Sequence, residues 1–233
     1  MNIALAVLAW LVCQTVPVPG IGNQVTGGSP SIALVSHCVA TNTGTCTIDT
    51  TGATLIIVDQ LTGGTGTLGA APTENKGNTF QVPAATTCAN GTSGVVQAYY
   101  IYNPTVGSSH IFTGHASSNV YFVSAWSGTD TTSAVYDTGN CHSQGGGGGT
   151  TFQPGSITPA ATNEVVFTMA FNVDSGTGTW TVPTSFSVVN TSTGYGAEST
   201  AYYVYPSTSA LNPTWTNLNN QNFVGNIAVF KHQ

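Results

Sequence analysis

The chain carries the same succession of segments twice. "AYYIYNPT" at 98–105 recurs as "AYYVYPSTSALNPT" at 201–214. Residues 47–58 align without a gap over residues 156–167, which places Ile48 over Ile157. Further along, "VYFVSAW" at 120–126 falls over "VGNIAVF" at 224–230, so the order holds through most of both halves. The sequence therefore predicts one fold built from two similar halves, about 31–127 and 150–231.

Both halves consist of short β-branched and aromatic runs separated by Gly, Pro, Asn and Ser clusters, a pattern typical of strands and turns. We expect strands at 32–37, 53–60, 78–82, 94–103, 108–113, 119–126, 133–136, 164–172, 178–182, 185–190, 199–205, 213–217 and 223–230. This spacing predicts an all-β protein, an antiparallel β-sandwich of jelly-roll type.

Two arrangements of the duplicated strands are open. Either each half closes its own sandwich, or the halves interleave their strands into one sandwich. We favour the interleaved sandwich, because each half alone has barely six expected strands. Residues 128–155 contain "GGGGG" at 145–149 and are expected to be a flexible connection or a loop tip, since glycine loses the most backbone entropy on ordering.

Charge is nearly absent from the chain. Only 4% of residues are charged, against about 25% in ordinary domains, and Lys76 and Lys231 are the two cations. Nucleic acids and anionic lipids are bound by clusters of Lys and Arg. We therefore exclude nucleic acid as a direct partner, and we expect a surface of hydroxyl and amide groups.

The N-terminal residues 1–22 include an apolar stretch from Ile3 to Val12. This stretch is shorter than the roughly 18 residues of a membrane span, so no integral membrane span is expected. We interpret the segment as a signal peptide ahead of the sandwich at 23–233. The alternative is a retained apolar segment that docks on a neighbouring subunit.

Cysteine usage agrees with export. If Cys13 leaves with a signal peptide, four cysteines remain, which allows three pairings. We favour Cys38–Cys46, which closes "CVATNTGTC", and Cys88–Cys141, which joins two Gly/Asn-rich loops. No Cys-x-x-Cys occurs, and we expect neither a metal nor a cofactor.

Catalytic chemistry finds little support in the sequence. A glycosidase needs two carboxylates that face each other across a cleft, and most of the eight carboxylates lie beside turn residues. Glu164 and Glu198 are the least implausible pair. His110 and His115 flank a strand and are expected at polar strand ends near solvent. Asp59 aligns with Thr168 rather than with Asp174, which argues against a duplicated calcium loop.

The Tyr-rich runs supply candidate ligand contacts. Exposed Tyr side chains stack on sugar rings, so Tyr100, Tyr102, Tyr203 and Tyr205 are candidate glycan-contact residues. Aromatic packing between strands is the alternative, and the duplication favours it. The search for function then narrows to what differs between the halves: the cysteine loops, the glycine run and the six extra residues before the second Asn-Pro-Thr.

Several motifs are shared with a loose group of proteins. The combination of "TTGATLIIV", "KGNTF", "AYYIYNPTVGSSHIFTG", "VSAWSG", "GSITPAATNEVVF", "GYGAESTAYYVY", "NPTWT" and "IAVFK" resembles uncharacterised Gly/Ser/Thr-rich β-sandwich proteins of bacterial secreted and phage virion origin. The resemblance covers roughly residues 31–231 and implies a surface module such as a virion decoration, an adhesin or a matrix component. The chain departs from the group in its four cysteines and in "TENKGNTF", where such proteins often have Asp and Trp.

Together these features predict a non-enzymatic extracellular or virion-surface protein that works in adhesion or assembly, with a glycan or further copies of itself as partner. One alternative is a self-assembling filament subunit that adds its N-terminal segment to a neighbour's sheet edge. The other is a carbohydrate-active enzyme of jelly-roll type, in which Glu164 and Glu198 would meet in one cleft.

Overall fold

The computed structural model describes residues 31–41, 44–64, 68, 70–91, 94–115, 120–145, 149–174, 178–193, 196–217, 219 and 221–233. All regular elements in these ranges are strands. No helix in the described ranges is long and apolar enough to cross a bilayer. The predictions for residues 1–22 lie outside the described residues.

The first half contains eight strands. They are β1 (Ala33–Thr41), β2 (Thr45–Ile48), β3 (Leu55–Gly63), β4 (Thr73–Glu74), β5 (Cys88–Asn90), β6 (Gly94–Tyr102), β7 (His110–Thr113) and β8 (Val120–Ser127). Five of them form one antiparallel sheet in the order β1-β8-β3-β6-β5, and the other three form a smaller sheet in the order β2-β7-β4.

The second half repeats this plan strand for strand. Its strands are β9 (Tyr136–Gln144), β10 (Thr151–Phe152), β11 (Glu164–Asn172), β12 (Trp180–Thr181), β13 (Ser187–Ser192), β14 (Glu198–Tyr205), β15 (Trp215–Asn217) and β16 (Phe223–Phe230). The sheets have the orders β13-β14-β11-β16-β9 and β10-β15-β12, which are those of the first half with eight added to each strand number. Each half is therefore a jelly roll of its own.

The expected interleaved sandwich is wrong, because no described strand of one half joins a sheet of the other. Each half has enough strands because it includes strands of two to four residues, such as β4 and β10, which are too short to show an alternating pattern. The second half also begins before residue 150. Strand β9 lies inside the expected connection, and its polar sequence "YDTGNCHSQ" gave no strand signal.

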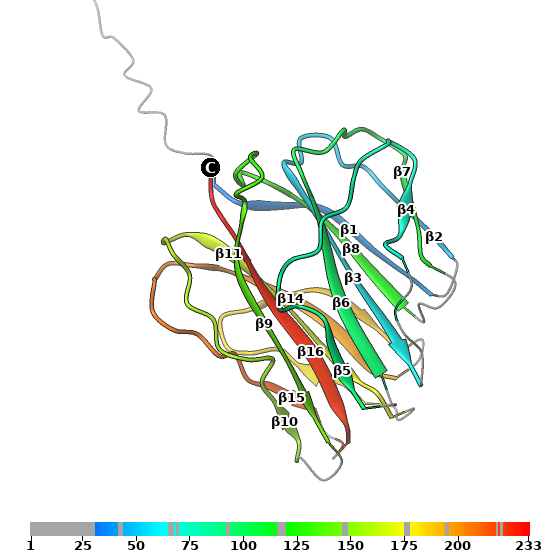
Figure 1. Cartoon of the computed structure of the whole chain (residues 1–233), viewed down its shortest axis with the longest axis vertical. Coiled ribbons are helices and arrows are strands. Elements are labelled where there is room, and N and C mark those ends of the chain that lie inside the picture. The colour runs from blue at the N-terminus through cyan, green and yellow to red at the C-terminus, as the bar shows by residue number, and fades with distance from the viewer. Residues whose placement is uncertain are drawn as a thin grey trace, which may run out of the picture.

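The four sheets stack in layers, with the two five-stranded sheets in the middle and a three-stranded sheet outside each of them (Figure 1). Leu55, Ile57 and Trp126 from one half pack against Phe167 and Phe230 from the other in the central core. The outer cores lie beneath the small sheets and include Phe112 in the first half and Trp215 in the second. The central strands β3, β8, β11 and β16 are therefore covered on both faces, as the apolar residues on both faces of 120–126 predict.

The duplicated strands match in order, but the Tyr-rich runs differ in register by one residue from the sequence alignment. Leu55 and Val165 both face the central core; Leu55 pairs with Tyr102 and Val165 with Val204. Tyr102 is therefore equivalent to Val204 and not to Tyr205. A shift of one residue moves a side chain to the other face of a sheet. As a result Tyr100 faces the central core, whereas Tyr203 packs against the outer core of the second half.

The same displacement affects β3 and β11, because Leu55 is equivalent to Val165 and the gapless alignment places it over Glu164. The alignment of β8 with β16 is correct, since Trp126 and Phe230 both lie in the central core and pair with Leu55 and Val165.

The carboxyl group of Asp59 is buried in the central core. The Asn226 side chain of the other half donates a hydrogen bond of 2.9 Å to Asp59 Oδ1 and one of 3.3 Å to the Thr86 carbonyl. Asp59 Oδ2 has no hydrogen-bond partner among the described residues. Complete burial raises the pKa of Asp59 to about 7, although the bond from Asn226 opposes this shift.

Both predicted disulfides are confirmed. Cys38–Cys46 joins β1 to β2 within the first half, and Cys88–Cys141 joins edge strand β5 of one half to edge strand β9 of the other. At the opposite edge of the central sheets, His37 Nδ1 lies 2.8 Å from Asn190 Oδ1, which links β1 to β13. Two disulfides indicate a non-reducing environment.

The two disulfides should differ in their contribution to stability. In the loop-entropy model, the 53-residue separation of Cys88–Cys141 corresponds to about 4 kcal/mol and the 8-residue separation of Cys38–Cys46 to about 2.5 kcal/mol. We expect C88A/C141A to lower the free energy of unfolding more than C38A/C46A in urea denaturation. The reverse order would contradict a cross-link between halves.

Stability should fall as the pH rises from about 4 to about 7, because the folded protein holds the Asp59 proton that the unfolded chain releases. The shift from 3.8 to about 7 corresponds to roughly 4 kcal/mol. Asp59→Asn should flatten this fall in urea denaturation across that range, and the exposed Asp49→Asn should not. An unchanged pH dependence in Asp59→Asn would contradict the burial of this carboxyl group.

Candidate functional site

A polar groove lies in the second half, where β9 passes β10 and the residues before β15. It consists of two adjoining cavities of about 350 and 310 Å³ that share His142 and Gln153. The other lining residues are Asn140, Cys141, Gln144, Thr151, Gly155, Asn212 and Thr214. None of these lining residues is Asp, Glu, Lys or Arg, so the groove offers amide, hydroxyl and imidazole groups only.

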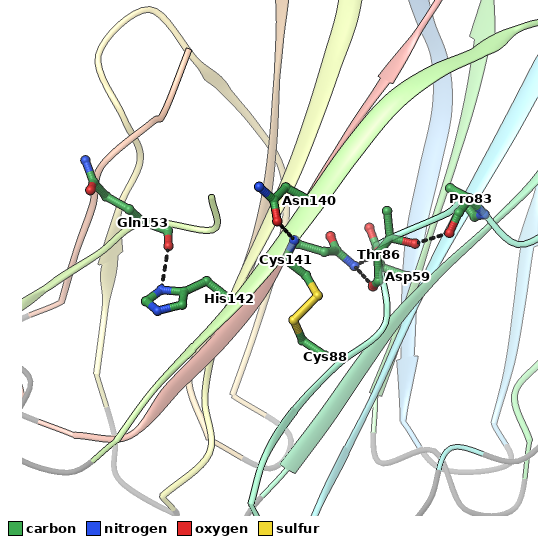
Figure 2. Close-up of a disulfide and its surroundings, with 9 residues drawn as sticks. Asp59, Pro83, Thr86, Cys88, Asn140, Cys141, His142 and Gln153 are labelled. Atoms are coloured by element: carbon green, nitrogen blue, oxygen red, sulfur yellow. Dashed lines mark hydrogen bonds between the residues drawn. A yellow bond between two sulfur atoms is a disulfide. The ribbon is translucent and has the colours of Figure 1, made fainter. Parts of the chain in front are cut away.

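Strand alternation directs the β9 side chains into this groove. Cys141 points toward the first half, where it is bonded to Cys88. Its neighbours Asn140 and His142 therefore point to the opposite face. Figure 2 shows His142 and Gln153 on one side of the disulfide, with Asp59 and Thr86 on the other. The disulfide thus fixes the strand that carries the polar side chains.

A buried aromatic ring lies next to His142. The exposed His142 ring lies nearly parallel to the buried Phe152 ring, with 6.0 Å between centroids and 5° between planes. Phe152 in turn packs over Gly225, the β16 residue that pairs with His142. A Cβ atom at position 225 would lie 2.7 Å from the Phe152 ring, so only glycine allows this approach.

Hydrogen bonds hold the groove side chains in place. His142 Nδ1 lies 3.0 Å from the backbone carbonyl of Gln153. A carbonyl oxygen only accepts, so Nδ1 carries the proton and Nε2 of the neutral ring is an acceptor. The Gln153 side chain donates to Thr214 Oγ1 at 2.9 Å and accepts from Asn212 Nδ2 at 3.3 Å.

The first half has a disulfide where the second half has this groove. Cys38 pairs with Val123 on β8, and Asn140 pairs with Ile227 at the equivalent place on β16. Cys38 is therefore equivalent to Asn140, whose side-chain amide donates to the Ser156 carbonyl at 3.0 Å. The Cys38–Cys46 bond ties β1 to β2, whereas Asn140 contacts the segment after β10 by a hydrogen bond instead of a covalent bond.

The candidate tyrosines do not form one surface. Tyr100 is 7% exposed and packs against Tyr136 and Phe230 in the central core, with ring centroids 6.1 and 5.5 Å away. Tyr102 is half-buried against the same core. Tyr203 and Tyr205 are half-buried against the outer core of the second half and lie edge to face at 5.7 Å. The four rings are divided between two cores, as aromatic packing predicts.

The two carboxylates proposed for catalysis are far apart. Glu164 pairs with Tyr205 and Glu198 pairs with Phe171, so they lie at opposite ends of the β11–β14 ladder. The prediction that they meet in one cleft is wrong. Both are buried. Burial, with a smaller contribution from Asp137, raises the pKa of Glu164 to about 7, and Glu198 accepts a hydrogen bond of 2.8 Å from the Gly196 N–H.

His110 is buried, contrary to its expected position near solvent. Its Nε2 lies 2.7 Å from Glu74 Oε2, and its Nδ1 lies 3.0 Å from the buried Thr50 hydroxyl. Burial lowers the pKa of His110 against the effect of Glu74. Burial alone would raise the pKa of Glu74, but the Lys76 and Asn78 N–H groups and His110 lower it. These contacts hold together the segments that carry Thr50, Glu74 and His110 around the β2-β7-β4 sheet. Because the side chains are buried, a substrate has no access to them.

In the described ranges, no group of three or more His, Cys, Asp or Glu side chains could hold a metal ion. No family model, curated protein or solved structure matches the chain. The resemblance to secreted and virion β-sandwich proteins therefore stays a prediction.

Sequence reasoning missed the groove residues, because β9 lies in the segment expected to connect the halves. The groove is nevertheless bordered by features that distinguish the two halves. These are Cys141, the β9–β10 connection that carries the glycine run, and the second Asn-Pro-Thr. The two Asn-Pro-Thr motifs are not equivalent, since the first opens the 103–109 loop and the second closes the 206–214 loop. The signal that could have located the site is the polar alternation in "NCHSQ" at 140–144.

The burial of the tyrosines predicts a large difference between two alanine variants. Tyr100→Ala should lower the free energy of unfolding by about 3–5 kcal/mol, as for other buried aromatic side chains, because it leaves a cavity between the halves. Tyr205→Ala should cost less, since its ring is only half-buried. Urea denaturation measures both, and a loss for Tyr205→Ala at least as large would contradict the placement of these rings.

Proposed function

We propose that the protein is a non-enzymatic extracellular or virion-surface protein that works in adhesion and binds neutral glycans in the β9–β10 groove. The observation that carries the proposal is the lining of this groove: its described residues offer amides, hydroxyls and an imidazole, and none of them is charged. Sugar hydroxyls both donate and accept, and amide side chains supply both kinds of partner.

The distribution of charge on the rest of the molecule supports a neutral ligand. Of the eight carboxylates, Asp59, Glu164 and Glu198 are buried, and the Glu74 side chain is 2% exposed beside His110. The outer surface therefore carries little charge of either sign. A charged glycan would find few opposite charges for recognition.

Two observations favour binding over catalysis. Glu164 and Glu198 are separated by the length of β11, and the groove lining includes no carboxylate to serve as general acid, base or nucleophile. The disulfides support an extracellular or virion-surface location over a reducing compartment. The filament alternative depends on the N-terminal segment, which lies outside the described residues.

The test is retention of the purified protein on immobilised neutral polysaccharides such as cellulose, chitin, amylose, mannan and dextran, with alginate and heparin as anionic comparisons. We expect retention on at least one neutral polymer and none on the anionic ones. H142A/Q153A should lose about tenfold in affinity, equivalent to about 1.4 kcal/mol.

The control is Thr47→Ala, because Thr47 is an exposed threonine on β2 of the first half and is not among the residues that line the groove. It should leave retention unchanged, and circular dichroism would check that all variants are folded. Retention on no neutral polymer, or equal retention of H142A/Q153A and the parent protein, would contradict the proposal.

A further inference from the structure

We infer that the groove takes a linear chain of neutral sugar units lying along β9, with His142 Nε2 accepting a hydrogen bond from a sugar hydroxyl. This inference rests on the proposed function and specifies its ligand. It depends on the order of the lining residues along the strands, on the hydrogen bonds already made by the β9 backbone, and on the protonated nitrogen of His142.

The lining residues form three successive rows across the groove. Asn140 lies beside Gly155, and its amide donates to the neighbouring Ser156 carbonyl at 3.0 Å. His142 and Gln153 form the middle row, and Gln144 and Thr151 line the cavity beyond them. Alternate residues of a strand are about 6.6–6.8 Å apart, so the three rows extend over about 13 Å. A groove of this length is longer than one sugar ring and fits a chain of rings.

An extended peptide is the other polymer that could lie along an edge strand, but two backbone groups of β9 beside the groove are already engaged. The Cys141 N–H donates to the Asn140 side chain at 2.8 Å, and the Gln144 carbonyl accepts from Asn90 Nδ2 at 2.8 Å. Strand addition needs free backbone donors and acceptors on the edge. The groove therefore presents side chains to its ligand, which favours a glycan over a peptide.

The polarity of the middle row selects a hydroxyl donor. Because the Gln153 carbonyl holds the proton on His142 Nδ1, the neutral ring presents Nε2 as an acceptor. The Gln153 amide is fixed by Asn212 and Thr214, so the row is ordered before a ligand arrives. Preorganised polar groups lose less entropy on binding. No Lys or Arg lines the groove to pair with a carboxylate or sulfate on an acidic sugar.

Isothermal titration calorimetry with cello-, chito-, malto- and manno-oligosaccharides of one to six units tests the inference. In the series that matches the retained polymer, affinity should rise at least about tenfold from one unit to three or more. Asn140→Ala and Thr151→Ala, which change the two end rows, should each reduce affinity for the long oligosaccharides with little effect on the single sugar. Thr47→Ala should change neither.

A second measurement follows the imidazole directly. Ring ¹⁵N spectra of the full chain should show His142 protonated on Nδ1, and the Nε2 signal should shift when the oligosaccharide is added. Protonation on Nε2 in the neutral free protein would overturn the inference. His142→Gln, which keeps a side-chain acceptor, should retain more affinity than His142→Ala.

The outcomes separate the inference from the proposed function. Affinity independent of chain length, with neutral polymers still retained, would overturn the linear ligand and leave glycan binding in place. Binding of neither polymers nor oligosaccharides would remove both. Tighter binding of a strand-forming peptide of alternating threonine and valine than of any oligosaccharide would overturn the choice of glycan over peptide.

Discussion

The packing of the two five-stranded sheets against each other is the contact on which the rest of the molecule depends. A jelly roll usually encloses one core between its two sheets, but here each large sheet is apolar on its second face as well. Separation of the halves would expose Trp126, Phe167 and Phe230 to water. The chain is therefore arranged like a symmetric dimer joined into one polypeptide. Asp59 is accommodated in this contact because burial favours its protonated form and Asn226 reaches it from the other half.

Much of this fold could be predicted from the sequence, because its central strands are long and rich in β-branched and aromatic residues. The duplication, the all-β class and the double-sided burial of 120–126 follow from such patterns, and both disulfides belong to the favoured one of the three pairings that four cysteines allow. The register of these strands could not be predicted. The similarity of "AYYIY" and "AYYVY" aligns Tyr100 with Tyr203, but the two strands are offset by one residue, so the two side chains face different cores. The number of strands was underestimated because short strands such as β4 and β10 carry no periodicity and because β9 is polar throughout.

The candidate site was out of reach of sequence reasoning for a related reason. Strand β9 is an edge strand whose outward side chains face water and whose inward Cys141 is bonded to Cys88, so it lacks the apolar alternation by which strands are recognised. The two halves then differ most at equivalent corners. The first half closes its corner with Cys38–Cys46, whereas the second places His142 over Phe152 and leaves a groove. The two halves are thus two copies of one scaffold. The first is closed at this place by a disulfide, and the second carries the polar side chains of the groove.

The Cys88–Cys141 bond also determines how the protein responds to tension. A pull along the chain reaches Cys88 and Cys141 on either side of a 53-residue segment, and the covalent bond between them bypasses that segment. At about 3.4 Å per extended residue, roughly 180 Å of chain is withheld from stretching. Strands β6, β7 and β8 lie inside this shielded loop, and β9 is anchored at its boundary. The groove side chains on β9 are thus attached at a point of the chain that stays fixed to the first half under load.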